Sequence, residues 1–197
     1  LLFDAGDLFQ GTMASNISQG KAVIAAYNEM GYTASAIGNH EFDFGPQTPE
    51  SADRLGTLKQ RLRQAQFPFL AANIFDSTTG KRVNWPNTQP TLLIDKGTIK
   101  IGVIGIASPQ TPNTTRRQYI QGLTFKAPLP IVTHHARRLR KAGANIIILL
   151  THMGGKCTNL DKPNSITSCN KDSDLLELLH SLPTGTVDIA IGGHTHG

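Results

Sequence analysis

The chain has 197 residues, of which 39% are hydrophobic, so it is long enough to bury a core and too apolar to be disordered. Its formal net charge of +5 at pH 7 is compatible with an anionic ligand but specifies neither a fold nor a partner. No run approaches the roughly 20 apolar residues that a membrane span requires, so we expect no such span in this chain.

Two short strands are predicted near the amino terminus, and each runs into a polar segment that contains glycine. The first leads into Asp7, and the second, at 33–37, leads into Asn39 and His40. Between them we expect a helix over 15–31, because Ser and Asn can cap its start, apolar residues recur at helical spacing and a glycine ends it.

A second helix is expected to begin at Thr48 and to run through Leu62, with a proline in its first turn and an acidic residue near its positive end. Strands follow at 69–73, 91–95 and 100–106, separated by turns that contain Asn, Gly and Pro. The last two of these strands are joined by a short glycine turn, which predicts a hairpin.

A helix is also expected over 130–142, and it carries a cluster of basic residues at 137–141. Such a cluster can indicate nucleic-acid binding, but the apolar residues on the same helix favour a solvated basic face. We therefore expect no nucleic-acid polymer as a partner. His134, His135 and the more distant His180 lie within helical patterns, so we expect them to be structural or solvent-facing.

Two further strands end in segments that carry imidazole groups. The strand at 145–151 leads into His152, and the strand at 187–191 leads into His194 and His196. Alternate side chains of an extended segment share one face, so the last two histidines can point into one cavity. An isolated pair of this kind is more often a polar surface turn. The repetition of the pattern at other strand ends favours a metal site.

These strand ends are expected to meet, because ligands of α/β proteins gather outside the carboxyl ends of the strands. The side chains offer oxygen and imidazole ligands but no thiolate, which suits Mn, Fe or Zn in a hydrolytic site better than a structural zinc ion. One carboxylate surrounded by an amide and imidazoles is typical of a dinuclear centre. The alternation of strands and helices predicts an α/β fold with mixed sheets.

The polar segments resemble those of the calcineurin-like metallophosphoesterases, and within them the group of 5′-nucleotidases, UDP-sugar hydrolases and cyclic-nucleotide phosphodiesterases. In the family's order they are GDLFQG (6–11), GNHEFDFG (38–45), THMG (151–154) and GHTHG (193–197). The resemblance covers essentially the whole chain. It implies a four-layer α/β/β/α sandwich with two mixed sheets.

The resemblance also implies a metal-binding role for five residues. Asp7 would bridge two divalent metal ions, Zn, Mn or similar. Asn39, His152 and His194 would complete the coordination of one ion, and His196 would belong to the other.

His40 would then be the catalytic histidine that contacts the phosphate and the leaving group, and Asp43 would orient it. The implied function is hydrolysis of nucleotide phosphate esters, of the 5′-nucleotidase type, with a nucleotide as the small-molecule substrate. A cyclic-nucleotide phosphodiesterase, a UDP-sugar hydrolase and a thiosulfohydrolase-like relative remain alternatives within the enzyme class. A non-catalytic descendant that binds a nucleotide or a partner is the alternative outside it, although a pure binder has no physical need for all of these residues.

Two parts of the family pattern are missing from this sequence. An Asp-x-His motif on an opening strand would precede Leu1, and a carboxyl-terminal domain that binds the nucleoside would follow Gly197. We therefore expect 1–197 to be a metallophosphoesterase catalytic domain truncated at both ends, and a poor catalyst by itself.

Cys157 and Cys169 bound a polar segment that has no core of its own. Their spacing fits a disulfide, two reduced thiols or a metal site that includes His152. The usual export of the family favours the disulfide, and it implies a periplasmic, cell-surface or secreted location.

Overall fold

The computed structural model describes residues 1–159, 161, 167–170 and 172–195. The helices and strands, in chain order, are β1 (Phe3–Asp4), α1 (Met13–Ile17), α2 (Lys21–Met30), β2 (Ala34–Ala36), η1 (His40–Phe42), α3 (Gly56–Gln64), β3 (Phe69–Leu70), β4 (Ile74–Asp76), β5 (Thr88–Gln89), β6 (Thr91–Asp95), β7 (Lys100–Ile106), α4 (Thr111–Thr114), η2 (Arg117–Tyr119), β8 (Leu123–Phe125), α5 (Pro128–Lys141), β9 (Ile146–Thr151), α6 (Asp174–Ser181) and β10 (Ile189–Gly192). Within the described residues these elements form two four-stranded sheets and a two-stranded antiparallel ribbon of β4 and β8.

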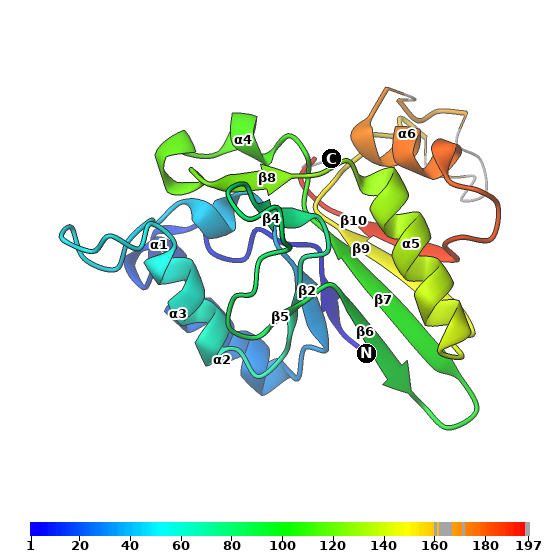
Figure 1. Ribbon diagram of the computed structural model, residues 1–197, viewed down its shortest axis with the longest axis horizontal. Coiled ribbons are helices and arrows are strands. Elements are labelled where there is room, and N and C mark those ends of the chain that lie inside the picture. The colour runs from blue at the N-terminus through cyan, green and yellow to red at the C-terminus, as the bar shows by residue number, and fades with distance from the viewer. Residues whose placement is uncertain (160, 162–166, 171, 196–197) are drawn as a thin grey trace.

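The first sheet has the strand order β1-β2-β3-β5, and its strands pair only in parallel within the described part of the chain. Helices α2 and α3 lie on its outer side (Figure 1). No hairpin joins neighbouring strands here, and parallel neighbours require crossover connections. The expectation of a mixed sheet is therefore wrong for this sheet.

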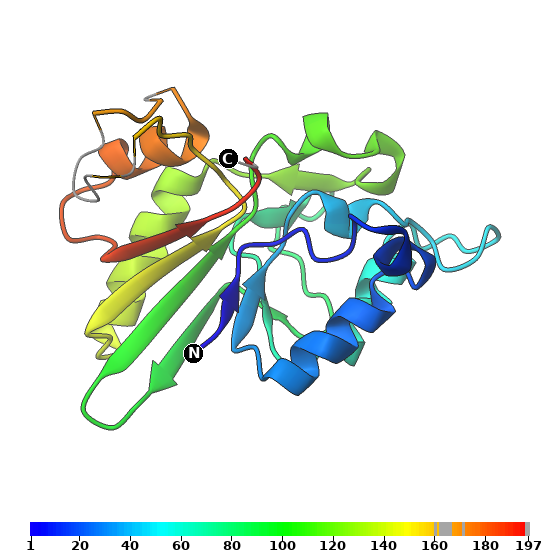
Figure 2. The ribbon, with the colours of Figure 1, turned by 180° about the vertical axis from the view of Figure 1, so that it is seen from behind.

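The second sheet has the order β10-β9-β7-β6 and is mixed, as expected. Strands β6 and β7 form the predicted antiparallel hairpin, whereas β7, β9 and β10 are parallel. Helices α5 and α6 lie on its outer side, which Figure 2 shows from behind. The four layers of the expected α/β/β/α sandwich are confirmed.

The two sheets approach closely because small residues lie between them. Ala34 and Ala36 of β2 are fully buried in this central layer, together with Leu70 and Val103. A Cβ atom on Gly105 of β7 would lie only 2.4 Å from the backbone oxygen of Leu70. The glycine is therefore required for the sheet spacing, which brings the strand ends of both sheets within reach of each other.

The helix expected over 15–31 is interrupted. Gly20 adopts a left-handed conformation with φ of 81° and separates α1 from α2, whereas Gly31 ends α2 as predicted. The Ser and Asn that were expected to cap one long helix lie inside α1 instead.

The second helix begins at Gly56, not at Thr48, so the predicted start was wrong. The preceding segment folds back on the helix, where the Gln47 side-chain amide donates to the Gly56 carbonyl at 3.0 Å. The Thr57 N–H also donates to the carbonyl of Gly45, at 3.1 Å. These tertiary contacts override the local capping signal.

The strand expected over 69–73 is also shorter, because the chain leaves the first sheet after Leu70. The Ala72 N–H donates to the carbonyl of Gly105 at 2.8 Å, and the Asn73 side chain hydrogen-bonds to Ala107. This segment therefore connects the two sheets. None of the helices in the described residues combines the length and the apolar character needed to cross a bilayer.

Candidate active site

Asp7 lies in a tight turn after β1. Its φ of 68° is left-handed, and the preceding Gly6 has φ of 96°. Left-handed backbone is uncommon outside glycine, although Asp and Asn tolerate it better than other residues. A Cβ atom on Gly6 would lie 2.6 Å from the Gly38 nitrogen, and one on Gly38 would lie 2.3 Å from Asp7 Oδ1. The turns that follow β1 and β2 therefore pack backbone against backbone.

Asp7, His152 and His194 form a cluster of potential metal ligands. One ligand atom from each lies within 4.8 Å of the others. Asp7 comes from the first sheet, whereas His152 follows β9 and His194 follows β10 of the second sheet. The expected convergence of strand ends thus brings these three side chains together.

The His152 ring is held in one orientation. Its Nδ1 lies 2.8 Å from the carbonyl oxygen of Ala5, and a carbonyl only accepts, so Nδ1 carries the proton. In the neutral ring Nε2 then bears the lone pair, and it lies 2.9 Å from Asp7 Oδ2. This buried nitrogen makes no hydrogen bond to any residue that the structure describes. A lone pair that faces a carboxylate requires a cation between them, either a proton or a metal ion.

The charges in this cluster favour such a cation. Burial by itself would raise the pKa of Asp7, but His152 and the His40 N–H stabilise the carboxylate and lower it overall. Burial alone would lower the pKa of His152, but the Asp7 carboxylate raises it above the ordinary value. Burial, followed by the nearby charge of His152, lowers the pKa of His194 below its ordinary value.

Asn39 offers a further donor atom at the end of β2. Its side chain is buried, and the amide nitrogen donates to the Thr114 carbonyl at 3.2 Å. That bond leaves the side-chain oxygen Oδ1 buried and without a hydrogen-bond partner among the described residues. Buried polar atoms rarely remain unpaired, so this oxygen and His152 Nε2 both fit a bound divalent cation.

His40 and Asp43 form a separate pair beside the cluster. Nδ1 of His40 lies 2.5 Å from the Asp43 carboxylate, which also accepts a hydrogen bond from the Thr115 hydroxyl at 3.1 Å. Nε2 of His40 lies 3.9 Å from Asp7 Oδ2, and 32% of its side chain is exposed. This partly exposed side chain can therefore meet a ligand that also contacts the cluster.

Glu41 is a site residue that the sequence analysis did not single out. Its carboxylate accepts hydrogen bonds from the N–H groups of Asp7, Leu8 and Gly38, and only 1% of the residue is exposed. Burial, together with the negative charge of Asp7, raises the pKa of Glu41 to about 7. The sequence shows Glu41 only as an acidic residue inside the 38–45 motif. No spacing rule distinguishes a buried, hydrogen-bonded glutamate at this position from a solvent-exposed one.

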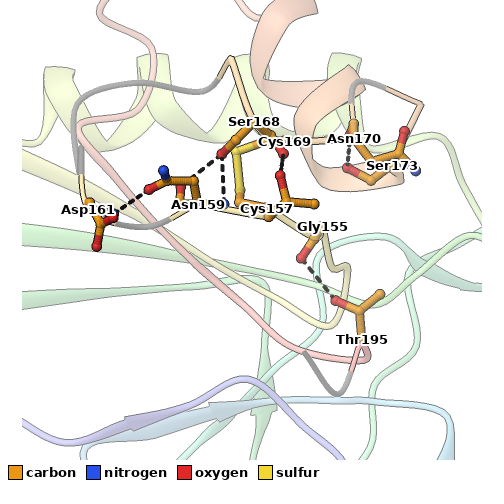
Figure 3. The surroundings of a disulfide bond; sticks show 10 residues. Gly155, Cys157, Asn159, Asp161, Ser168, Cys169, Asn170, Ser173 and Thr195 are labelled. Carbon is orange, nitrogen blue, oxygen red and sulfur yellow. Dashed lines mark hydrogen bonds between the residues drawn. A yellow bond between two sulfur atoms is a disulfide. The ribbon is translucent and has the colours of Figure 1, made fainter.

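Cys157 and Cys169 are joined by a disulfide, as expected, so neither sulfur is free to bind a metal. Figure 3 shows the disulfide and the Thr195 hydroxyl, which donates at 3.2 Å to the carbonyl of Gly155, two residues before Cys157. The disulfide segment is thereby linked to the turn that carries His194. His196, the remaining predicted ligand, lies outside the described residues.

The predicted structural histidines lie away from this site. His134 and His180 are exposed, and His135 is half-buried on α5. These positions agree with the expectation that the three histidines are structural or solvent-facing.

In a comparison with known protein families, residues 1–197 match the calcineurin-like phosphoesterase family. The chain therefore belongs to the calcineurin-like phosphoesterase family. It is 33% identical to protein UshA of Yersinia enterocolitica over 196 residues, which cover 99% of this chain and 32% of that protein. It is 31% identical to the snake venom 5′-nucleotidase of Crotalus adamanteus over 197 residues, covering 100% and 28% of the two chains.

The fold is similar to that of a putative 5′-nucleotidase from Staphylococcus aureus solved in complex with alpha-ketoglutarate. The TM-score is 0.75 at 26% identity, and the match covers 98% of this chain and 36% of that chain. The chain thus spans about a third of the length of the relatives that it matches.

Proposed function

We propose that residues 1–197 form the catalytic domain of a metal-dependent phosphoesterase that hydrolyses nucleotides. The observation that carries this proposal is the convergence of Asp7, His152 and His194 from two sheets, with the His40–Asp43 pair directly beside them. A metal-ligand cluster next to a partly exposed imidazole that is oriented by a carboxylate fits hydrolysis better than binding alone.

The residues present fit a bound divalent cation. Asp7, Asn39, His152 and His194 would hold one ion, and Asp7 with His196 would hold a second, so the centre would be dinuclear. Oxygen and imidazole donors suit Zn or Mn. When bound, such ions polarise the phosphoryl oxygens and supply a nucleophilic water at neutral pH.

The chain itself contributes proton transfer and orientation. His40 would donate a proton to the leaving oxygen of the ester through Nε2, because its other nitrogen is held by Asp43. Thr115 holds the Asp43 carboxylate in place from the opposite side. Asp43 is therefore a positioning residue, and His40 is the catalytic acid.

A 5′-nucleotide is the substrate that the relatives favour, because two of those compared are named 5′-nucleotidases. We propose an extracellular, periplasmic or cell-surface location, supported by the disulfide and by a relative from venom. Cyclic-nucleotide phosphodiesterase, UDP-sugar hydrolase and thiosulfohydrolase-like activities remain the alternatives to test in parallel.

Phosphate release from nucleoside 5′-monophosphates, measured with Mn²⁺ or Zn²⁺ present, tests the proposal. Asp7→Asn should lower metal content and hydrolysis together, since one carboxylate serves the whole cluster. Asn tolerates left-handed backbone, so this variant changes the ligand and not the turn. Asp53→Asn, on the surface, is the matched control. Nucleotide binding without phosphate release at saturating metal would contradict catalysis and favour a non-catalytic binder.

A further inference from the structure

Successive backbone N–H groups of the Asp7 turn each donate to a carboxylate. Gly6 donates to Asp4 Oδ1 at 2.7 Å, and Asp7 donates to Glu41 Oε2 at 2.8 Å. Leu8 donates to the other oxygen of Glu41, Oε1, at 2.6 Å. The turn is therefore held by its amides and not by side-chain packing alone.

Glu41 also reaches the neighbouring turn, because its Oε2 accepts the Gly38 N–H at 2.6 Å. One buried carboxylate thus joins the turn after β1 to the turn after β2. Among the described residues, the hydrogen bonds of Glu41 all come from backbone N–H groups. Glu41 is not one of the residues whose ligand atoms form the cluster with Asp7, so in this arrangement it supports the backbone and does not contact the candidate metal position.

The Asp7 conformation needs such support. A non-glycine residue with positive φ is strained and persists only where its surroundings hold it. The Asp7 N–H and the following Leu8 N–H both donate to the carboxyl group of Glu41, at 2.8 and 2.6 Å, and these two hydrogen bonds provide that support. If the turn relaxed, Asp7 Oδ1 would lose the His40 N–H at 2.9 Å, and Oδ2 would move away from His152.

We propose that Glu41 is the positioning residue of this site, holding Asp7 in the left-handed turn that directs its carboxylate at His152 and His194. This proposal rests on the proposed function, because it treats Asp7 as a metal ligand. It adds that the metal affinity of this centre depends on a residue that does not touch the metal. Partners of this kind typically contribute about 10- to 100-fold to metal affinity.

Glu41→Gln tests the proposal at constant side-chain size. The amide presents an NH₂ group to one of the backbone N–H donors, so at least one hydrogen bond is lost. Asp188→Asn is the matched control, because the Asp188 carboxylate also accepts a backbone N–H, from Ile147 at 2.6 Å, at the opposite end of β9. Each variant loses a carboxylate that accepts a backbone N–H group, but only Glu41 lies next to the site.

Amide hydrogen exchange of the metal-free protein, read residue by residue by NMR, is the first measurement. In Glu41→Gln we expect exchange at Asp7 and Leu8 to be at least about tenfold faster than in the wild type. Asp188→Asn should leave both rates unchanged. Unchanged rates at Asp7 and Leu8 in Glu41→Gln would overturn the proposal.

Calorimetric titration with Mn²⁺ is the second measurement. We expect Glu41→Gln to weaken Mn²⁺ binding by about 10- to 100-fold and Asp188→Asn to leave it unchanged. Equal Mn²⁺ affinity in Glu41→Gln and the wild type would also overturn the proposal. If the wild type itself binds no metal, the proposed function fails instead, and amide exchange alone decides the role of Glu41.

Glu41→Asp provides a second variant in case Glu41→Gln does not fold. It keeps the charge but is one methylene shorter, so it cannot reach both turns. Exchange at Leu8 or Gly38 should then be faster than in the wild type. Wild-type rates at both positions would contradict the proposal.

Discussion

His40 and His152 differ in the partner that holds the ring, and this difference separates their roles. His152 has a backbone carbonyl at Nδ1, so the ring donates there and directs Nε2 at the Asp7 carboxylate. His40 has the Asp43 carboxylate at the same position, which orients the ring and leaves Nε2 towards the cluster. The first arrangement is typical of a metal ligand and the second of a general acid.

His40→Asn should therefore separate chemistry from metal binding. We expect kcat for nucleoside monophosphates to fall by roughly 10²-fold or more, the scale of a lost general acid, while the metal content stays that of the wild type. Steady-state kinetics and elemental analysis of the same preparations give both quantities. His180→Asn, which removes an exposed imidazole from α6, should change neither. A proportional fall in activity and metal content would identify His40 as a ligand.

At the scale of elements, the segment after β9 packs tightly against the turn after β10. A Cβ atom on Gly154 would lie 2.2 Å from the Thr195 hydroxyl oxygen and 2.5 Å from the Gly193 carbonyl oxygen. The Gly193 N–H donates to the Met153 carbonyl at 3.2 Å. Residues that follow two parallel strands thus support each other, and the disulfide closes the longer connection beside them.

Replacing Cys157 and Cys169 with serine should lower the stability of the folded protein. In the chain-entropy model, closing a loop of this size stabilises the fold by about 3 kcal/mol through the unfolded chain. The melting temperature should therefore fall, while Mn²⁺ still binds, because the predicted ligands are unchanged. Calorimetry and metal titration of the double variant measure both effects. An unaltered melting temperature, or free thiols in mass spectra of non-reduced peptides from oxidised material, would contradict a stabilising disulfide.

At the scale of the whole molecule, the site lies where two sheets meet, and its supporting helices lie on the outside. Helix α5 covers the second sheet with Val132, Ala136 and Leu139. It exposes Arg137, Arg138 and Lys141, whereas Arg140 is half-buried and paired with Asp188. This arrangement agrees with a solvated basic face. His135 is half-buried on the same helix, so the stability of the packed molecule should depend on its protonation.

Acid should destabilise the fold through His135. Burial, followed by the charges of His134, Arg138 and Arg82, lowers its pKa from 6.5 to about 4. Between these values the unfolded chain binds the proton and the folded chain does not, so the contribution of His135 is present above pH 6.5 and is lost as pH falls towards 4. Melting temperatures of His135→Gln should decline less steeply over this range. His180→Gln should follow the wild-type curve, and parallel curves for all three proteins would refute this assignment.

The chemistry available to this protein was determined by its sequence. Apolar runs that end in glycine and a polar residue are local patterns, so Asp7, Asn39, His152 and His194 could be proposed without knowledge of distant contacts. The hairpin between β6 and β7 followed from a short glycine turn in the same way. These features depend on neighbours in the chain, which the sequence lists directly.

Only the tertiary structure decided the geometry. The contact between His152 and Ala5 joins residues that are 147 positions apart, and it exists because small side chains let two sheets pack closely. The role of Glu41 depends on the pairing of β1 with β2 in the first sheet, since two of its donors lie on the turn after β1. The start of α3 at Gly56 also depended on a fold-back contact with Gln47. Distances between remote segments are set by packing of the whole core, which no local pattern encodes.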